Sequence, residues 1–183
     1  MRINCGMASV LTIGHSTRPL AALIAALRAH GVGRLLDIRS IPRSRHNPQF
    51  NREGLAAALP AAGIAYEHRP GLGGLRRPRP DSPNRGWRNS GFRGFADYMQ
   101  TAAFAGELEA LIAQAQSQPL AIMCAEAVPW RCHRSLVADA LAVRGVAVEH
   151  IIDEAHRAPH KLTPFARVDG TRLTYPPAEG ELL

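Results

Sequence analysis

Lysine is nearly absent from this chain of 183 residues: Lys161 is the single lysine, and the other 21 basic side chains are arginines. Cysteine is scarce as well, with only Cys5, Cys124 and Cys132, so a disulfide framework is excluded and we expect free thiols. Long hydrophobic runs are also missing, since Arg, His, Pro or Gly interrupts every apolar stretch before the roughly 18–20 residues of a membrane helix. An integral membrane protein is therefore excluded.

The composition that is present favours one compact domain. With 46% hydrophobic and 20% charged residues, the chain is long and apolar enough to bury its own core, and neither a collagen-like nor a wholly disordered chain is expected. The segment before Met7 carries one arginine and no continuous apolar stretch that leads to a cleavage site. We therefore expect a cytoplasmic protein, with Met7 as an alternative start to Met1.

The net charge of +7 is unevenly distributed. Residues 34–93 hold twelve arginines against four acidic residues, whereas the rest of the chain has a net charge of −1. Such a basic block indicates an anionic partner, either nucleic acid or a phosphorylated small molecule. A solvated loop in an arginine-rich protein is an equally good interpretation.

Short apolar runs alternate with amphipathic segments along the chain. Strands are predicted at 10–13, 35–39, 64–68, 120–124 and 146–152. Helical spacing of apolar residues is found in 20–27, 55–59, 92–99, 108–112 and 136–141. For the first of these helices the N-cap is predicted at Ser16 or Thr17. The alternation predicts an α/β three-layer sandwich, in which a mostly parallel sheet of about five strands has helices on both faces.

Residues 8–155 are expected to form this single domain. Within it, prolines and glycines stand among arginines at 70–91, and no regular element is expected there. A loop of this length in a compact domain is typical of a functional or mobile segment. Residues 156–183 are rich in proline and are expected to be an irregular tail.

Polar or titratable side chains follow nearly every predicted strand. In an open parallel sheet, ligands bind beyond the carboxyl ends of the strands, where helix N-termini also point. We therefore expect these groups to meet at one edge of the sheet. They are His15 and Ser16, Asp37, Arg39 and Ser44, Glu67 and His68, and Cys124, Glu126, Cys132, His133 and Arg134.

The densest group, from Cys124 to Arg134, has three interpretations. In the first, Cys124 is a nucleophile, favoured as a thiolate by the following helix N-terminus, and the loop amides with Arg134 hold an anionic substrate. In the second, Cys124, Cys132 and His133 are ligands of zinc or iron, with His15 as a further candidate ligand. In the third, the thiols are structural. The sequence leaves all three open, and it does not identify a cofactor.

The leading hypothesis is an enzyme that acts on a phosphate- or carboxylate-bearing substrate at this edge. His15 or His133 would serve as acid or base, and Glu126 would orient a partner. Substrate binding would fall to Ser16, Asp37, Arg39, Ser44, His68 and Arg134. Structural interpretations compete at several positions: His15 as a histidine bridging two loops, and Asp37 with Arg39 as an ion pair. The rival function is a nucleic-acid-binding or nucleic-acid-processing module that uses the arginine-rich segment 69–93.

Four motifs also carry a family resemblance. They are Thr12-Ile13-Gly14-His15-Ser16, Asp37-x-Arg39-x-x-Pro42-x-Ser44, Gly63-Ile64-x-Tyr66-x-His68 with Leu72-Gly73-Gly74, and Cys124-x-Glu126-x-x-Pro129-x-x-Cys132-His133-Arg134. In order and in register, from about Val10 to Ile152, they resemble the DUF488 family of uncharacterised bacterial and archaeal proteins. The resemblance implies an α/β domain in which His15, Ser16, Asp37, Arg39, Ser44, His68, Cys124, Glu126, Cys132, His133 and Arg134 are positions of the family's motifs. It does not supply a reaction.

Overall fold

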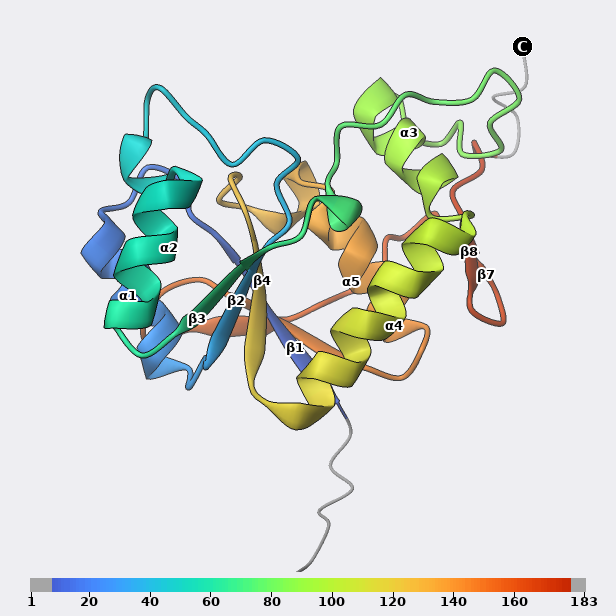
Figure 1. The fold of residues 1–183 in the computed structure, drawn as a ribbon. Coiled ribbons are helices and arrows are strands. Elements are labelled where there is room, and N and C mark those ends of the chain that lie inside the picture. The colour runs from blue at the N-terminus through green and yellow to red at the C-terminus, as the bar shows by residue number, and fades with distance from the viewer. Residues whose placement is uncertain (1–7, 179–183) are drawn as a thin grey trace, which may run out of the picture.

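The computed structural model describes residues 8–178, and these residues contain a six-stranded sheet of order β3-β2-β4-β1-β5-β6 (Figure 1). Strands β1 to β5 pair in parallel and β6 pairs antiparallel with β5, which confirms the predicted mostly parallel sheet. There is one strand more than the five expected. The strands are β1 (Ser9–Gly14), β2 (Arg34–Asp37), β3 (Ala65–His68), β4 (Leu120–Cys124), β5 (Ala147–Ile151) and β6 (Arg157–Pro159).

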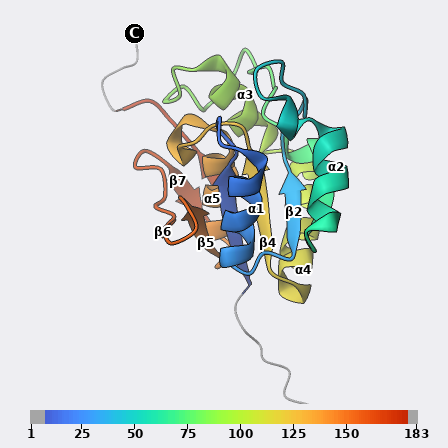
Figure 2. The same cartoon turned by 90° about the vertical axis from the view of Figure 1, so that its left-hand side faces the viewer.

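Helices cover both faces of the sheet, as predicted (Figures 1 and 2). One face carries α1 (Leu20–Ala29) and α2 (Arg52–Ala61), and the other carries α3 (Ser90–Tyr98), α4 (Ala102–Ser117) and α5 (Arg134–Ala142). Both faces of the sheet can be covered because successive side chains along a strand point to opposite faces. In β4, Ala121 and Met123 pack against α1 and α2, whereas Ile122 and Cys124 face the other three helices.

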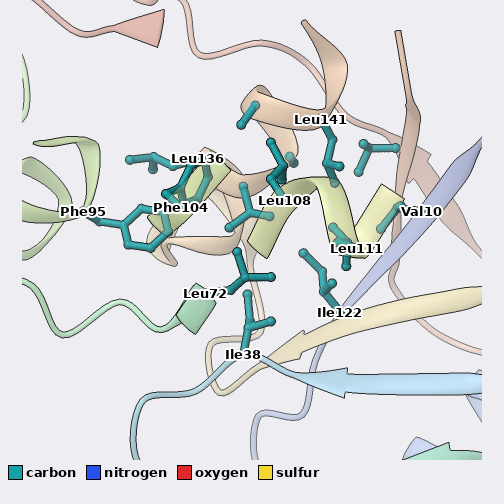
Figure 3. Close-up of a cluster of buried hydrophobic side chains, with 14 of the residues drawn as sticks. Val10, Ile38, Leu72, Phe95, Phe104, Leu108, Leu111, Ile122, Leu136 and Leu141 are labelled. Atoms are coloured by element: carbon teal, nitrogen blue, oxygen red, sulfur yellow. The ribbon is translucent and has the colours of Figure 1, made fainter. Parts of the chain in front are cut away.

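The larger core lies between the sheet and α3, α4 and α5 (Figure 3). Phe95, Phe104, Leu108 and Leu136 from these helices are buried in it. So is Leu72, which belongs to the short 3-10 turn η2 (Pro70–Leu72) after β3. Burying a leucine side chain is worth about 1.5–3 kcal/mol, so this contact anchors the beginning of the arginine-rich loop to the core.

The direction of the chain crossings reverses at the neighbouring strands β1 and β4. From β1 the chain crosses one face through α1 to reach β2, and from the adjacent β4 it crosses the other face through α5 to reach β5. Ligands of open α/β sheets bind near such a reversal. Here the loops after β1 and β4 are joined, because the N–H groups of His15 and Ser16 donate to the carbonyls of Cys124 and Ala125, and the cavity lies instead between the loops after β2 and β4. Residues 38–51, 69–89 and 125–133 gather at this edge, at the top of Figures 1 and 2.

The predicted N-cap of the first helix is wrong. Helix α1 begins after Pro19 rather than after Ser16 or Thr17. Ser16 has a positive φ of 51°, and its N–H donates to the carbonyl of Ala125 in the loop after β4. Because the backbone of Ser16 makes that contact, it does not cap the helix. Helix α1 starts directly after Pro19, whose fixed φ is compatible with a helix.

The tail expected to be irregular contains regular structure. Strand β6 adds to the main sheet, and β7 (Arg167–Asp169) pairs with β8 (Arg172–Thr174). Beyond β8 the ring of Tyr175 is fully buried, and its hydroxyl donates to Asp139 at 2.8 Å. The proline content predicts an irregular segment, but the buried ring and the buried hydrogen bond of Tyr175 hold its end against α5.

Two sequence expectations fall on residues outside the described range: the free thiol of Cys5 and the alternative start at Met7. Within residues 8–178, no helix combines the length and the apolar character needed to cross a bilayer.

Candidate functional site

A cavity of about 320 Å³ opens at the carboxyl ends of β2 and β4. Three loops and the first turn of α3 form its wall. The lining residues are Arg39, Ser40 and Ile41 after β2; Gly74 and Leu75 after β3; Asn89, Gly91 and Phe92 around the start of α3; and Cys124, Ala125, Glu126, Arg131, Cys132 and His133 after β4.

Two thiols and one imidazole meet in the wall of this cavity. Cys124 is the last residue of β4, and Cys132 and His133 stand between the 3-10 turn η3 (Pro129–Arg131) and helix α5. His133 Nδ1 lies 3.8 Å from the sulfur of Cys124 and 3.8 Å from that of Cys132. The three ligand atoms all lie within 4.8 Å of one another. Both cysteines are free and buried.

The proton on His133 can be assigned from its second nitrogen. Nε2 lies 3.0 Å from the carbonyl oxygen of Leu72, and a carbonyl only accepts, so Nε2 carries the hydrogen of the neutral ring. The lone pair of Nδ1 is therefore directed at the two sulfurs. Phe95 holds the ring with its centroid 5.0 Å away, and a Cβ on Gly74 would lie 2.5 Å from Nδ1. Because Gly74 has no side chain, the backbone can lie against this imidazole.

The two thiols differ in acidity. The pKa of Cys124 is raised well above its ordinary value, because its thiol donates to the sulfur of Cys132 and because it is buried. The same hydrogen bond, with the positive charge of Arg134, lowers the pKa of Cys132 despite its burial. In the metal-free site the geometry therefore favours Cys132, rather than Cys124, as the thiolate.

Arg39 is held in place by four hydrogen bonds. Its Nε and Nη2 donate to the carboxylate of Asp37 at 2.8 and 2.6 Å, and Nη2 also donates to the carbonyl of Phe50 at 2.7 Å. Nη1 lies 3.2 Å from Nε2 of His15. Burial alone would lower the pKa of Arg39, but its hydrogen bonds with Asp37 and the charge of that carboxylate raise it. One of the five guanidinium N–H groups remains, on Nη1, and Arg39 lines the cavity.

His15 supports Arg39 and does not line the cavity. Its Nδ1 lies 2.8 Å from the carbonyl of Ser16 and must donate, so Nε2 accepts from Arg39. Burial, together with the charge of Arg39, lowers the pKa of His15 and favours the neutral ring that this arrangement requires. Its ring also stacks on Phe50 with centroids 4.3 Å apart. Both nitrogens are therefore engaged in holding the loops together.

Other predicted site residues lie beneath or beside the cavity rather than in its wall. His68 Nε2 donates to the carbonyl of Arg39 at 2.8 Å. Ser44 accepts from the N–H of Asn47 and donates its own N–H to Asn51, so it stabilises a turn. Asp37 is fully buried against Arg39. These contacts fix the loop that carries Arg39.

Arg134 fixes the loop after β4. Its guanidinium is buried and donates to the carbonyls of Glu126 at 2.6 Å and Ala127 at 2.9 Å. Gly14 makes room for this loop, because a Cβ there would lie 1.8 Å from the carbonyl oxygen of Glu126. The exposed Glu126 side chain does line the cavity, and within residues 8–178 no hydrogen bond holds its carboxylate.

The structure thus brings Cys124, Cys132, His133, Arg39 and Glu126 to one cavity. The cavity is also lined by residues that the sequence does not single out as a site, among them Ile41, Leu75, Asn89, Phe92 and Arg131. The position of Asn89 could have been predicted, because asparagine is a preferred N-cap residue. Its Oδ1 accepts from the N–H groups of Gly91 and Phe92 at the start of α3.

The fold and the site define an α/β protein with a cysteine- and histidine-lined cavity at the carboxyl edge of a parallel sheet. The chain belongs to the family described as "Domain of unknown function DUF488", whose model matches residues 19–141. This confirms the resemblance read from the motifs, and the matched region contains Arg39, Cys124 and His133. No curated protein and no solved structure matches the chain.

Proposed function

We propose that this protein is an enzyme that acts on a phosphate- or carboxylate-bearing small molecule bound in the cavity. One observation carries the proposal: the guanidinium-bearing Arg39 and Arg131 line the same cavity as Cys124, Cys132 and His133. Anion-binding groups beside nucleophilic and basic groups are typical of active sites. A volume of about 320 Å³ suits a small molecule.

The two arginines would bind the anion in different ways. Asp37 and Phe50 already hold Arg39, so its remaining Nη1 N–H is offered without further loss of side-chain freedom. Arg131 is exposed and contributes charge at the mouth of the cavity. Neither Arg134 nor His15 lines the cavity. The guanidinium of Arg134 donates to the carbonyls of Glu126 and Ala127, and His15 contacts the carbonyl of Ser16 and Arg39.

The reactive groups are the thiols and the imidazole. His133 Nδ1 is a proton acceptor, and Glu126 is an exposed carboxylate at the rim that is available as a second acid or base. Ile41 and Leu75 also line the cavity, and they are 64% and 73% exposed. Such an apolar rim favours a substrate with an apolar part next to its anionic group.

The test is binding of matched anionic and neutral probes, measured by titration calorimetry at low salt. We expect AMP to bind and adenosine to bind more weakly, and citrate tests the carboxylate class. Arg131→Gln removes a positive charge from the mouth of the cavity and should weaken AMP binding about threefold to tenfold. A tenfold change in affinity corresponds to about 1.4 kcal/mol of binding free energy. The control Arg28→Gln removes an exposed charge that hydrogen-bonds Ala62 and does not line the cavity. Equal binding of AMP and adenosine, or equal loss in the two variants, would contradict the proposal.

Nucleic acid is a second candidate substrate, because the arginine-rich loop 70–91 borders the cavity at both of its ends. Gly74 and Asn89 line the cavity, and Arg77 and Arg85 between them are exposed. Phosphate contacts give an affinity that falls linearly with log salt, with a slope of about −0.7 per contact for single strands. Fluorescence anisotropy of a labelled 20-nucleotide strand should show a smaller slope for Arg77→Gln and Arg85→Gln. Absence of binding at low salt excludes this candidate.

A further inference from the structure

We infer that Cys124, Cys132 and His133 bind a divalent transition metal ion, Zn²⁺ in the first place, with one coordination position open to the cavity. The three residues are brought together from the end of β4 and the start of α5. A catalytic use of the ion rests on the proposed function. The binding of the ion does not, because it follows from these three side chains and their surroundings alone.

The distances suit a tetrahedral ion. With Zn–S near 2.3 Å and Zn–N near 2.0–2.1 Å, neighbouring ligand atoms of a tetrahedral site are about 3.6–3.8 Å apart. The two sulfur-to-Nδ1 separations are both 3.8 Å, and all three atoms lie within 4.8 Å of one another. Small rotations about the side-chain bonds would therefore complete the coordination without any movement of the backbone.

The donor set and its number define the kind of site. Thiolate and imidazole are ligands that zinc prefers, and carboxylate-binding ions such as Mg²⁺ and Ca²⁺ disfavour thiolates. Structural zinc sites have four protein ligands, whereas catalytic sites have three and keep one position for water or substrate. Here, within residues 8–178, three such residues cluster, and all three line the cavity. The pattern is that of a catalytic site.

The surroundings already orient the ligands. A metal-binding histidine almost always donates its other N–H to a carbonyl or carboxylate, and His133 Nε2 donates to the carbonyl of Leu72. The backbone N–H of Arg134 lies 3.5 Å from the sulfur of Cys132 and is placed to stabilise a thiolate. Phe95 and Gly74 confine the imidazole on its sides. The site therefore has the outer contacts of a metal centre as well as the ligands.

Charge gives a further argument. Two buried thiolates next to each other would be costly without a counter-ion, and a divalent cation neutralises both. Each thiol must lose its proton for binding, so Zn²⁺ uptake releases up to two protons per site. The neutral metal-thiolate unit then leaves the remaining Nη1 donor of Arg39 and the positive charge of Arg131 for an anionic ligand at the open position. When bound, the ion would polarise that ligand as a Lewis acid.

The experiment measures metal binding directly, on full-length protein purified without a polyhistidine tag. Metal-free protein is prepared with a chelator and titrated with Zn²⁺, followed by elemental analysis, and with Co²⁺, followed by absorption spectroscopy. We expect one ion per chain, sulfur-to-cobalt charge-transfer bands and the intense visible bands of tetrahedral Co²⁺. Weak octahedral bands without sulfur bands, or no ion retained after gel filtration, would overturn the inference.

Single substitutions identify the ligands. Cys124→Ser, Cys132→Ser and His133→Gln should each weaken Zn²⁺ binding by more than the tenfold to hundredfold typical of losing an outer contact. Cys5→Ser is the matched control, because it removes the remaining thiol of the chain, and it should bind one ion like the parent. Loss of the ion in Cys5→Ser, or its full retention in the other three, would contradict the assignment.

A measurement on the unsubstituted protein covers variants that do not fold. Iodoacetamide labelling read by peptide mass spectrometry should be slowed by stoichiometric Zn²⁺ at Cys124 and Cys132 but not at Cys5. Equal rates with and without Zn²⁺ at Cys124 and Cys132 would overturn the inference. The AMP titration separates the two proposals: metal binding without anion binding refutes the proposed function and leaves the metal site standing, and the reverse result refutes the metal site.

Discussion

His133 and His160 both lie against helix α5, one just before its first residue and the other beside Asp139 within it, yet their surroundings differ. His133 belongs to the cavity cluster, which we define as Cys124, Cys132 and His133. His160 belongs to a closed network, which we define as Thr12, His150, His160, Asp139 and Tyr175.

In the closed network, the hydroxyl, imidazole and carboxylate groups have hydrogen-bond partners within the protein. Asp139 accepts from the Tyr175 hydroxyl at 2.8 Å and from His160 Nε2 at 2.7 Å. His160 Nδ1 lies 3.0 Å from His150 Nε2, and His150 Nδ1 lies 2.7 Å from the Thr12 hydroxyl. With both rings neutral, one direction of donation from Thr12 to Asp139 satisfies all of these atoms.

The cavity cluster lacks this closure. Nε2 of His133 is satisfied by Leu72, but Nδ1 faces only two thiols, at distances long for strong hydrogen bonds. The two histidine clusters of this molecule thus differ in how completely the protein satisfies their polar atoms. In the closed network the protein satisfies the polar atoms of the side chains. In the cavity cluster Nδ1 of His133 and the two sulfurs keep coordination capacity that is directed at the cavity.

The largest effect is expected from Asp37→Asn, which breaks a buried ion pair below the cavity. Arg39 and Asp37 are 6% and 0% exposed, so an uncompensated buried charge remains and about 3–5 kcal/mol of unfolding free energy should be lost. The control Glu53→Gln breaks the pair with Arg43, which is 74% and 75% exposed, and should cost less than about 1 kcal/mol. Urea denaturation measures both. A similar small loss in the two variants would show that Arg39 is not rigidly held.

The closed network should also make stability depend on pH. Burial, with the charges of His160 and Arg134, lowers the pKa of His150 from 6.5 to about 4. The unfolded chain therefore binds a proton more readily, so this stabilisation is present above about pH 6.5 and is lost as the pH falls toward 4. The loss is on the order of 2–3 kcal/mol, at 1.36 kcal/mol for each pH unit.

His15 has a lowered pKa as well, so the informative quantity is the difference between the parent and His150→Gln. Urea denaturation from pH 7.5 to 4.5 should give a shallower decline for His150→Gln than for the parent. Parallel curves would mean that His150 is not the group that titrates.

Tyr175→Phe should have a smaller effect. It removes a hydroxyl that donates to the Asp139 carboxylate at 2.8 Å, and hydrogen bonds to charged groups are worth about 1.5–3 kcal/mol. Tyr98→Phe is matched to it, because that hydroxyl donates to the neutral carbonyl of Gly71, also at 2.8 Å, and should cost about 0.5–1.5 kcal/mol. Thermal melts compare the two. Zn²⁺ binding should be unchanged in both, and a change in Tyr175→Phe would connect the two clusters.

The smallest effect on stability is expected from His133→Gln in metal-free protein. The glutamine amide can donate to the Leu72 carbonyl in place of Nε2, and no strong hydrogen bond to Nδ1 is lost. The free energy of unfolding should therefore change by less than about 1 kcal/mol. Zn²⁺ binding should nevertheless be lost. Denaturation curves with and without Zn²⁺ give both quantities, and a large loss in the metal-free protein would place His133 in the structural class.

Much of the fold could be predicted from periodicity. The apolar run of β4 and the helical spacing of Leu136 and Leu141 have the lengths and periods that the structure shows, and their alternation implies a parallel sheet. The tail could not be predicted in this way. Tyr175 is placed by contacts with α5 and Trp87, far from it in sequence, and no local pattern contains them.

The candidate site could be predicted only as a group of residues at one edge. His15 and His133 both stand near strand or helix ends, and only the structure shows that the first is satisfied by Ser16 and Arg39. Arg134 reads in sequence as an anion ligand, but the carbonyls of the loop after β4 turn back onto it. The direction of a guanidinium depends on where a loop returns, and this information is not local.

Leu72 contacts both the interior of the molecule and the cavity cluster, since its side chain lies in the larger core and its carbonyl accepts from His133. A substitution that repacks the interior around Leu72 therefore shifts the carbonyl that orients the His133 imidazole. Variants of this chain that differ only in core residues can then differ in the orientation of this imidazole. A comparison confined to the residues lining the opening will overlook the origin of such differences.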